Sequence, residues 1–306
     1  MKTSEQHISA TKGKELFSRT YLPDEKSPKA VVMIIHGMLE HSGRYERFAK
    51  KLTENEFAVV AYDHRAHGKT DPDKPGILDY DDGFQYMVSD IQFVRNEVHK
   101  KFQGLPVIIF AHSLGSFLTQ RYMQLYDKAP AGIIYSGSNG KPPSTIYGGW
   151  VLSRFLAKIK GPKFKSRMIH KLSFEPFNAK FKPNRTDQDW LSRDTEEIDR
   201  YIRDPFCGII PSVAFYKQIF SGLMTVSAHK PFAGNNPQTP IMIISGDHDP
   251  VSDMGKGIQG LKKQLEKSGA SNLTVNLYPG GRHELLNEIN REEVMDDVVE
   301  WIEGIL

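Results

Sequence analysis

Short apolar runs alternate along this chain with segments of helical periodicity, and this alternation constrains the fold more than any other feature. Six runs have the length of strands: 30–35, 57–62, 106–111, 131–136, 240–245 and 272–278. Most of them are rich in Val and Ile and almost continuously apolar, as strands buried on both faces are. Helical patterns lie at about 43–54, 84–103, 114–126, 255–268 and 291–304. The alternation predicts an α/β fold, with a mostly parallel sheet and helices on both faces. Residues 6–22 predict a hairpin that turns at Lys12 and Gly13 and forms an antiparallel edge.

One interval breaks this rhythm. About 100 residues separate the predicted strands at 131–136 and 240–245, and a structureless loop of that length is rare inside a domain. The interval has helical patterns at 150–159 and 194–202, with Pro/Gly breaks at 142–143, 161–162 and 176. We therefore interpret residues 140–232 as a helical cap inserted into a core formed by residues 1–139 and 233–306.

Composition narrows the class of protein. The only cysteine, Cys207, excludes an intrachain disulfide and an all-cysteine metal site and favours a reducing cytoplasm. The longest apolar runs fall far short of the ~18 residues of a membrane span, and the first residues lack the apolar core of a secretory signal. A net charge of only +3 among 306 residues argues against a nucleic-acid partner.

The stretch VIIFAHSLGSFLTQRYM at 107–123 predicts a nucleophilic serine. An apolar strand runs into Ser113 and a helical pattern begins at once, which is the context of a nucleophile elbow. The residues two positions before and after such a serine must be small, because strand and helix approach each other there. Gly115 meets this need fully, and Ala111 departs from it by one methyl group.

The loop after the strand at 30–35 begins His-Gly-Met and predicts half of an oxyanion hole, which needs two backbone donors. One donor is expected from the N–H of Leu114, the residue after the serine. The other is expected from Met38, because Gly37 lets the backbone approach closely.

An acid and a histidine follow the last two predicted strands. The segment GDHDPV at 246–251 offers Asp247 and Asp249, and both qualify by position. His283 lies in a glycine-rich loop past the strand at 272–278. The order serine, acid, histidine is that of α/β-hydrolases, with one element at each strand end.

Together these segments resemble the monoglyceride lipase and lysophospholipase-like branch of the α/β-hydrolases, a group also called serine aminopeptidase-like. The stretch HGMLEHSGRYERFAKKL resembles the oxyanion loop and next helix of that family, and DHRAHGKT at 63–70 is similar to its D-x-R-G-H-G-x-S loop, with departures at Ala66 and Thr70. AHSLGS corresponds to the G-H-S-M-G-G motif of that family and departs from it at Ala111, Leu114 and Ser116. GDHDPV matches G-x-x-D-P-V, which selects Asp249 as the triad acid. Residues 189–208 resemble the caps of bacterial members.

The resemblance implies an α/β-hydrolase fold and a serine hydrolase that cleaves carboxylic esters, of monoacylglycerol or lysophospholipid type, through an acyl-enzyme. Ser113, His283 and Asp249 would form the triad, Met38 and Leu114 the oxyanion hole. No metal or organic cofactor is expected, and the partner is a small acyl ester. Asp63, His64 and His67 are then loop-fixing hydrogen bonders rather than metal ligands. Trp150, Phe155 and Phe206 are candidate liners of an acyl slot beneath the cap.

Two alternatives to an esterase stay open. An aminopeptidase of the same fold would need cap acids to hold a free amine; the acids at 187–204 could do so, although Arg193, Arg200 and Arg203 among them suggest internal ion pairs. The second alternative is a non-catalytic or slow-turnover small-molecule receptor on this fold. An intact triad argues against it.

The cap also carries a block of uneven charge. Residues 141–185 hold eleven Lys/Arg and one acid, Glu175. In 148–160, Trp150, Val151, Phe155 and Ile159 share one helical face and basic residues flank it. That face predicts either peripheral contact with an anionic membrane or packing against the core. The oligomeric state does not follow from the sequence.

Overall fold

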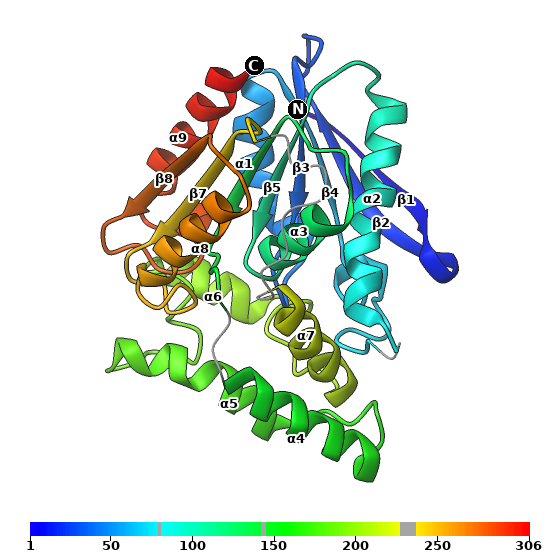
Figure 1. Ribbon diagram of the computed structural model, residues 1–306, viewed down its shortest axis with the longest axis vertical. Helices are drawn as coiled ribbons and strands as arrows, with labels where there is room; N and C mark the ends of the chain where they lie inside the picture. The colour runs from blue at the N-terminus through cyan, green and yellow to red at the C-terminus, as the bar shows by residue number, and fades with distance from the viewer. Residues whose placement is uncertain (79–80, 142–144, 227–236) are drawn as a thin grey trace.

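The sheet of the computed structural model has eight strands in the order β1-β2-β4-β3-β5-β6-β7-β8 (Figure 1). The structure describes residues 1–78, 81–141, 145–226 and 237–306. All neighbours from β4 to β8 pair in parallel, whereas β1, β2 and β4 pair antiparallel. The strands are β1 Lys2–Ala10, β2 Lys14–Leu22, β3 Ala30–Ile35, β4 Phe57–Tyr62, β5 Val107–His112, β6 Gly132–Ser136, β7 Ile241–Gly246 and β8 Leu273–Tyr278. The predicted fold class is therefore confirmed.

The N-terminal hairpin forms the antiparallel edge as predicted, but it begins at Lys2 rather than at residue 6. Its turn is a 3₁₀ helix, Thr11–Gly13, in which both Lys12 and Gly13 have positive φ. The first residues of β1 escaped prediction because they are polar and exposed, so they show no apolar run.

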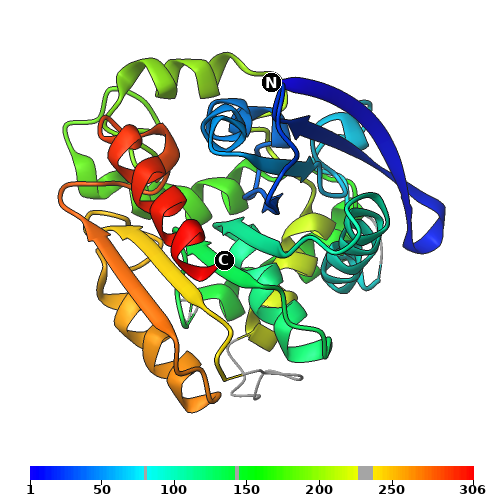
Figure 2. The same cartoon turned by 90° about the horizontal axis from the view of Figure 1, so that it is seen from above.

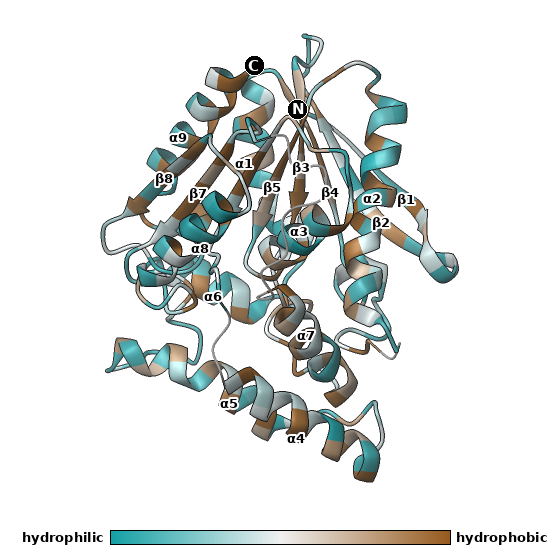
Figure 3. Cartoon of the chain, viewed as in Figure 1, coloured by the Kyte–Doolittle hydropathy of each residue, from teal (hydrophilic) through white to brown (hydrophobic). Residues whose placement is uncertain are grey.

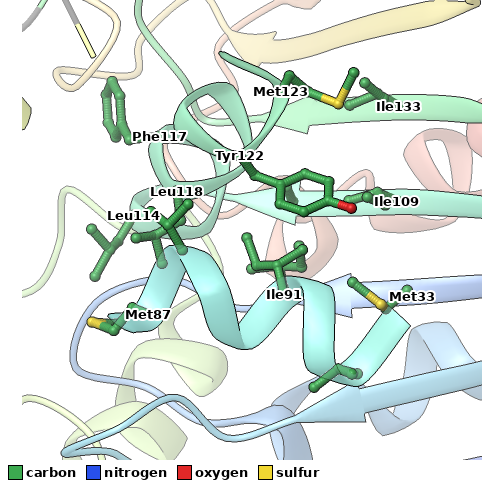
Figure 4. Close-up of a cluster of buried hydrophobic side chains, with 14 of the residues drawn as sticks. Met33, Met87, Ile91, Ile109, Leu114, Phe117, Leu118, Tyr122, Met123 and Ile133 are labelled. Atoms are coloured by element: carbon green, nitrogen blue, oxygen red, sulfur yellow. The ribbon is translucent and has the colours of Figure 1, made fainter. Parts of the chain in front are cut away.

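Helices cover both faces of the sheet (Figure 2). The helices α1, Glu46–Glu54, and α9, Arg291–Ile305, lie on one face; α2, Gly83–Lys101, α3, Leu114–Leu125, and α8, Lys256–Lys267, lie on the other. Alternate strand residues enter the two cores. Figure 4 shows Met33, Ile109 and Ile133 of the sheet together with Met87 and Ile91 of α2 and Leu118 of α3. Further 3₁₀ helices are Ser42–Tyr45, Gly68–Thr70, Ala179–Phe181 and Leu285–Asn287.

The long interval between β6 and β7 carries its own helices, as its length predicts: α4 Thr145–Lys160, α5 Arg167–Asn178, α6 Thr195–Arg203 and α7 Val213–Val226. In Figure 1, α4 and α5 lie at the end of the molecule far from both chain termini, with α7 between them and the sheet. The α7 side chains of Phe215 and Ile219 belong to the core cluster. The predicted boundary at 232/233 lies outside the described residues.

The predicted break at Pro176 is wrong, because Pro176 lies inside the last turn of α5. The helix ends two residues later at Asn178, so the kinking effect of proline falls where the helix is about to stop. Among the described residues, none of the helices is long and apolar enough to cross a membrane.

Candidate active site

Ser113 occupies the sharp turn between β5 and α3. Its φ of 50° and ψ of −118° are unusual for a residue with a side chain, and its N–H donates to Ser136 O over 2.9 Å. The residue two positions after the serine, Gly115, must be small, because an added Cβ there would lie 2.2 Å from Ile35 O of β3. Ala111 is fully buried. The turn therefore presents the serine at the carboxyl end of the central strands, as predicted.

The structure brings Ser113, His283 and Asp249 into one line. His283 Nε2 lies 2.9 Å from Ser113 Oγ, and His283 Nδ1 lies 3.0 Å from each Asp249 carboxylate oxygen. Asp249 is fully buried and also accepts a hydrogen bond from Val251 N over 2.8 Å. Burial alone would lower the pKa of His283, but the Asp249 carboxylate raises it above the usual 6.5. The arrangement can pull a proton from the serine hydroxyl.

Asp247, the other acid that position allowed, lies outside this line. Its side chain is 41% exposed and lies 2.6 Å from the Nδ1 atom of His248. It also accepts a hydrogen bond from Gly280 N over 2.7 Å, which fixes the turn beyond β8.

Met38 and Leu114 both line the cavity beside Ser113. Leu114 is the first residue of α3, so its N–H has no partner within the helix. Gly37 N donates to Glu40 Oε1 over 2.6 Å, which leaves Met38 as the next donor along the loop. Leu39, with a φ of 61°, is held by the segment after β6, since Tyr201 OH and Gly208 N both donate to Leu39 O.

A largely apolar cavity of about 830 Å³ opens from Ser113. Sequence reasoning missed its liners from the long interval, which come from α4, α5, α7 and Trp190: Leu152, Ile169, Leu172, Phe174, Phe177, Ile219, Phe220 and Leu223. The sequence signal for the liners on α7 is the spacing of apolar residues three or four apart in 213–226. The same spacing is equally typical of a helix buried in a core, so it does not identify a cavity wall.

The predicted liners Trp150, Phe155 and Phe206 are wrong. Leu152 of α4 lines the cavity instead. The helix presents the side with Leu152 to the cavity and leaves Phe155 58% exposed to solvent. Phe206 contacts the ring of His41 with centroids 5.8 Å apart.

The buried histidines near the site hold loops by hydrogen bonds. His64 N donates to His36 Nε2 over 3.0 Å, and Asp63 Oδ1 accepts from the N–H and hydroxyl of Ser42. The ring of His112 contacts that of His283 in a tilted arrangement, with centroids 4.8 Å apart and 46° between the planes. Burial, with the neighbouring His283, lowers the pKa of His112 to about 4, so its ring is neutral at pH 7.

Among the described residues, one group could hold a metal ion: His41, Asp204 and Cys207, whose ligand atoms lie within 4.8 Å of one another. These atoms already have other roles. His41 Nε2 lies 2.9 Å from Asp204 Oδ2, and Asp204 also accepts from Phe206 N. Burial raises the pKa of the Cys207 thiol far above its usual value, so the thiol is protonated and packs.

Comparisons with known proteins indicate the family of the chain. A family model described as serine aminopeptidase, S33, matches residues 26–290. The monoglyceride lipase of Rattus norvegicus is 25% identical over 303 residues, 97% of this chain and 89% of the relative. The monoacylglycerol lipase of Mycolicibacterium smegmatis is 25% identical over 301 residues, 98% of this chain and 96% of the relative. A carboxyl esterase from Bacillus coagulans, solved in complex with glycerol, matches with a TM-score of 0.90 at 26% identity and covers 100% of this chain and 99% of its own.

Proposed function

We propose that this chain, which belongs to the serine aminopeptidase S33 family of α/β-hydrolases, hydrolyses carboxylic esters through an acyl-enzyme on Ser113. The observation that carries the proposal is the line of contacts from Asp249 through His283 to Ser113 at the floor of an apolar cavity. Relatives along almost the whole chain named as lipases support an ester rather than a peptide substrate.

In the proposed reaction, Ser113 Oγ attacks the ester carbonyl while His283 Nε2 takes the hydroxyl proton. The carbonyl oxygen becomes an oxyanion that accepts from the N–H groups of Met38 and Leu114, each of which can lower the barrier by about 3 kcal/mol. The intermediate collapses, the alcohol leaves with the proton from His283, and the acyl group stays on Ser113. A water molecule then gives a proton to His283 and its hydroxyl to the acyl carbon. The bond from that carbon to Ser113 Oγ breaks, Ser113 takes the proton back from His283, and the acid is released.

We further propose that the substrates carry a long acyl chain, as in monoacylglycerols or lysophospholipids. A cavity of about 830 Å³ with mostly apolar walls suits such a chain better than a short polar acid. In this proposal residues 140–232 act as the cap that roofs the acyl chain, and α4, α5 and α7 supply most of its lining residues.

The contacts around the acids at 187–204 do not favour an aminopeptidase. Asp194 pairs with Arg291 over 2.7 Å, and Glu197 lies 2.6 Å from both Arg47 and Arg200. Asp189 accepts from Thr186 and from the backbone of Arg185. Because these carboxylates have partners, they offer a poor site for a free ammonium group.

The experiment that tests the ester activity compares wild type with Ser113→Ala. A fluorophosphonate should label wild type once, at Ser113, and p-nitrophenyl butyrate should be hydrolysed at least ~1,000-fold faster by wild type than by the variant. A series of monoacylglycerols and lysophospholipids of rising chain length then defines the substrate, and alanine-p-nitroanilide reports peptidase activity. Labelling at another residue, or an active Ser113→Ala protein, would contradict the assignment.

We also propose a cytoplasmic location with peripheral contact to anionic membranes through α4 and α5. The exposed fractions of Val151, Phe155 and Ile159 on α4 are 46%, 58% and 54%, and that of Met168 on α5 is 50%. Figure 3 shows hydrophobic segments on both helices at this end of the molecule. Exposed basic residues lie around them: Arg154, Lys158, Lys160, Lys165, Arg167 and Lys171. An apolar face rimmed by cations is the pattern of a helix that lies in a lipid interface.

Flotation with phosphatidylserine-containing vesicles tests this contact. Wild type should float at low salt and much less at physiological salt, because screening shortens the reach of the basic residues. Phe155→Ser with Ile159→Ser should abolish flotation but keep hydrolysis of p-nitrophenyl butyrate. Ile289→Ser is the matched control, since Ile289 is 61% exposed outside the helical interval. Equal flotation of the double variant and the control would contradict the proposal.

A further inference from the structure

Three charged side chains next to the candidate triad are buried or nearly buried and take no part in the proposed reaction. Their side chains are 4% exposed for Glu40, 10% for Arg44 and 7% for Glu284. Glu40 lies in the oxyanion loop, residues 36–41, Arg44 follows that loop, and Glu284 directly follows His283. Charged groups are rarely buried this far without a specific pairing.

Arg44 binds both carboxylates at once. Its Nη1 donates to Glu284 Oε1 over 2.6 Å and its Nη2 to Glu284 Oε2 over 2.6 Å, which is a two-pronged contact. The same Nη1 also donates to Glu40 Oε2 over 2.8 Å. Burial alone would lower the pKa of Arg44, but Glu284 raises it, and Arg44 in turn holds the pKa of Glu284 below its usual value.

Each carboxylate contacts or belongs to one of two loops, the oxyanion loop and the loop that carries His283. Glu40 Oε1 accepts from Gly37 N over 2.6 Å, directly before the proposed oxyanion donor, and from Tyr45 OH over 2.9 Å. Glu284 is joined to His283 by the peptide bond, and its N–H donates to Leu191 O over 2.8 Å. A continuous path of short contacts therefore runs from the oxyanion loop to the general base.

We propose that Arg44 is a positioning residue that fixes the oxyanion loop relative to His283 by binding Glu40 and Glu284 together. The inference rests on the proposed ester hydrolysis. Without the guanidinium, two buried carboxylates would face each other uncompensated, and the loops that carry them would separate or admit water. Lysine cannot replace arginine here, because a single ammonium lacks the planar fork that reaches both partners.

The first test compares Arg44→Lys and Arg44→Met with Arg47→Met. Arg47 is a matched control: it lies one turn away and its ion pair is with Glu197, whose side chain is 8% exposed, rather than with Glu40 or Glu284. Both Arg44 variants should lose kcat, by about 100-fold for methionine and by less for lysine, while KM changes little. Labelling of Ser113 by the fluorophosphonate should slow in parallel. Arg47→Met should lower Tm without lowering kcat.

Glu284→Gln gives a second test that does not depend on the folding of the Arg44 variants. The groups that face His283 are Asp249, Glu284, Glu40 and His112. Removing the charge of Glu284 takes away one of the negative charges that favour the imidazolium. The acid limb of the kcat/KM profile should therefore move to lower pH in the variant, an effect that a purely structural role would not produce.

The outcomes separate the two proposals. If wild type is labelled and active, and folded Arg44→Met keeps kcat within threefold or Glu284→Gln leaves the acid limb in place, the positioning role is wrong. If wild type is neither labelled nor active on any ester, the proposed function itself fails, and this inference fails with it.

Discussion

Replacing Gly115 with alanine tests whether the close approach of β3 and α3 holds the proposed oxyanion donors, the N–H groups of Met38 and Leu114, in place. The added Cβ would lie 2.2 Å from Ile35 O and 2.7 Å from His36 O. Both are backbone atoms and cannot rotate away. The strand and the helix must therefore separate by roughly 1 Å before the contact reaches an ordinary van der Waals distance.

The displacement should affect activity much more than stability. Overpacking of this kind costs about 1–3 kcal/mol of folding free energy, and each kcal/mol lowers Tm by about 2–4 °C in a domain of a few hundred residues. Leu114 immediately precedes Gly115, and Met38 follows Ile35 by three residues, so both donors move relative to Ser113. Loss of one oxyanion donor lowers kcat by roughly 100- to 1,000-fold. We expect at least a 100-fold loss of kcat with a fall in Tm below about 12 °C.

The assay measures p-nitrophenyl butyrate hydrolysis and thermal unfolding on the same preparations. Gly260→Ala is the control, because Gly260 lies within α8 and an added Cβ there meets nothing within 4 Å. It should keep full activity and gain up to about 1 kcal/mol, since alanine favours the helix. A Gly115→Ala protein that retains a third or more of wild-type kcat would refute the claim that this contact sets the donors.

Other substitutions and conditions test the same site. Asp249→Asn should lower kcat by about four orders of magnitude, because the histidine loses its orienting carboxylate, whereas Asp247→Asn should stay within threefold; the reverse result in the same ester assay would show that the wrong acid was chosen. Ala111→Val should reduce the rate of fluorophosphonate labelling by more than its loss of Tm explains, since two extra carbons crowd the elbow; unchanged labelling would mean that the elbow is loose. Burial lowers the pKa of His64 to about 3 and that of His112 to about 4, so the unfolded chain takes up protons below pH ~6.5 that the folded chain does not. The free energy of unfolding should therefore be unaffected by these two histidines above pH ~6.5 and should fall below it, by about 1.4 kcal/mol for each histidine at pH 5.5. Equal urea midpoints at pH 7.5 and pH 5.5 would contradict this sign.

The sheet could be predicted because its signal is local. Strands β3 and β4 have the predicted bounds of 30–35 and 57–62, since a strand buried on both faces is apolar at every position. The same reasoning fails for the first half of β1, whose side chains face solvent and carry no apolar pattern.

The candidate triad could be predicted because a parallel sheet gathers the carboxyl ends of its strands at one edge. Motifs that follow β5, β7 and β8 are therefore close in space although Ser113 and His283 are 170 residues apart. Position in the sequence alone could not decide which of Asp247 and Asp249 is the candidate triad acid. It depends on the turn after β7, which buries Asp249 against His283 and leaves Asp247 at the surface.

The bridge from Arg44 to Glu284 could not be read from the chain, because its members are 240 residues apart and lack any periodic signal. Each acid or base alone resembles an ordinary surface charge. Only the fold shows that all three lie, buried or nearly buried, at the junction of two loops. This is why the motifs named the candidate reacting groups but not the residue proposed to align them.

The faces of α4 show a second limit of periodicity. Its apolar residues span more than one side, and a sequence pattern cannot say which side meets the rest of the protein. In the structure Leu152 lines the cavity and Leu156 packs inside the helical interval, while Phe155 and Ile159 point outward among basic residues. This exposed apolar face among basic residues is the observation on which the proposed lipid contact rests. Such a contact would bring a membrane-borne acyl chain to the helices that line the cavity.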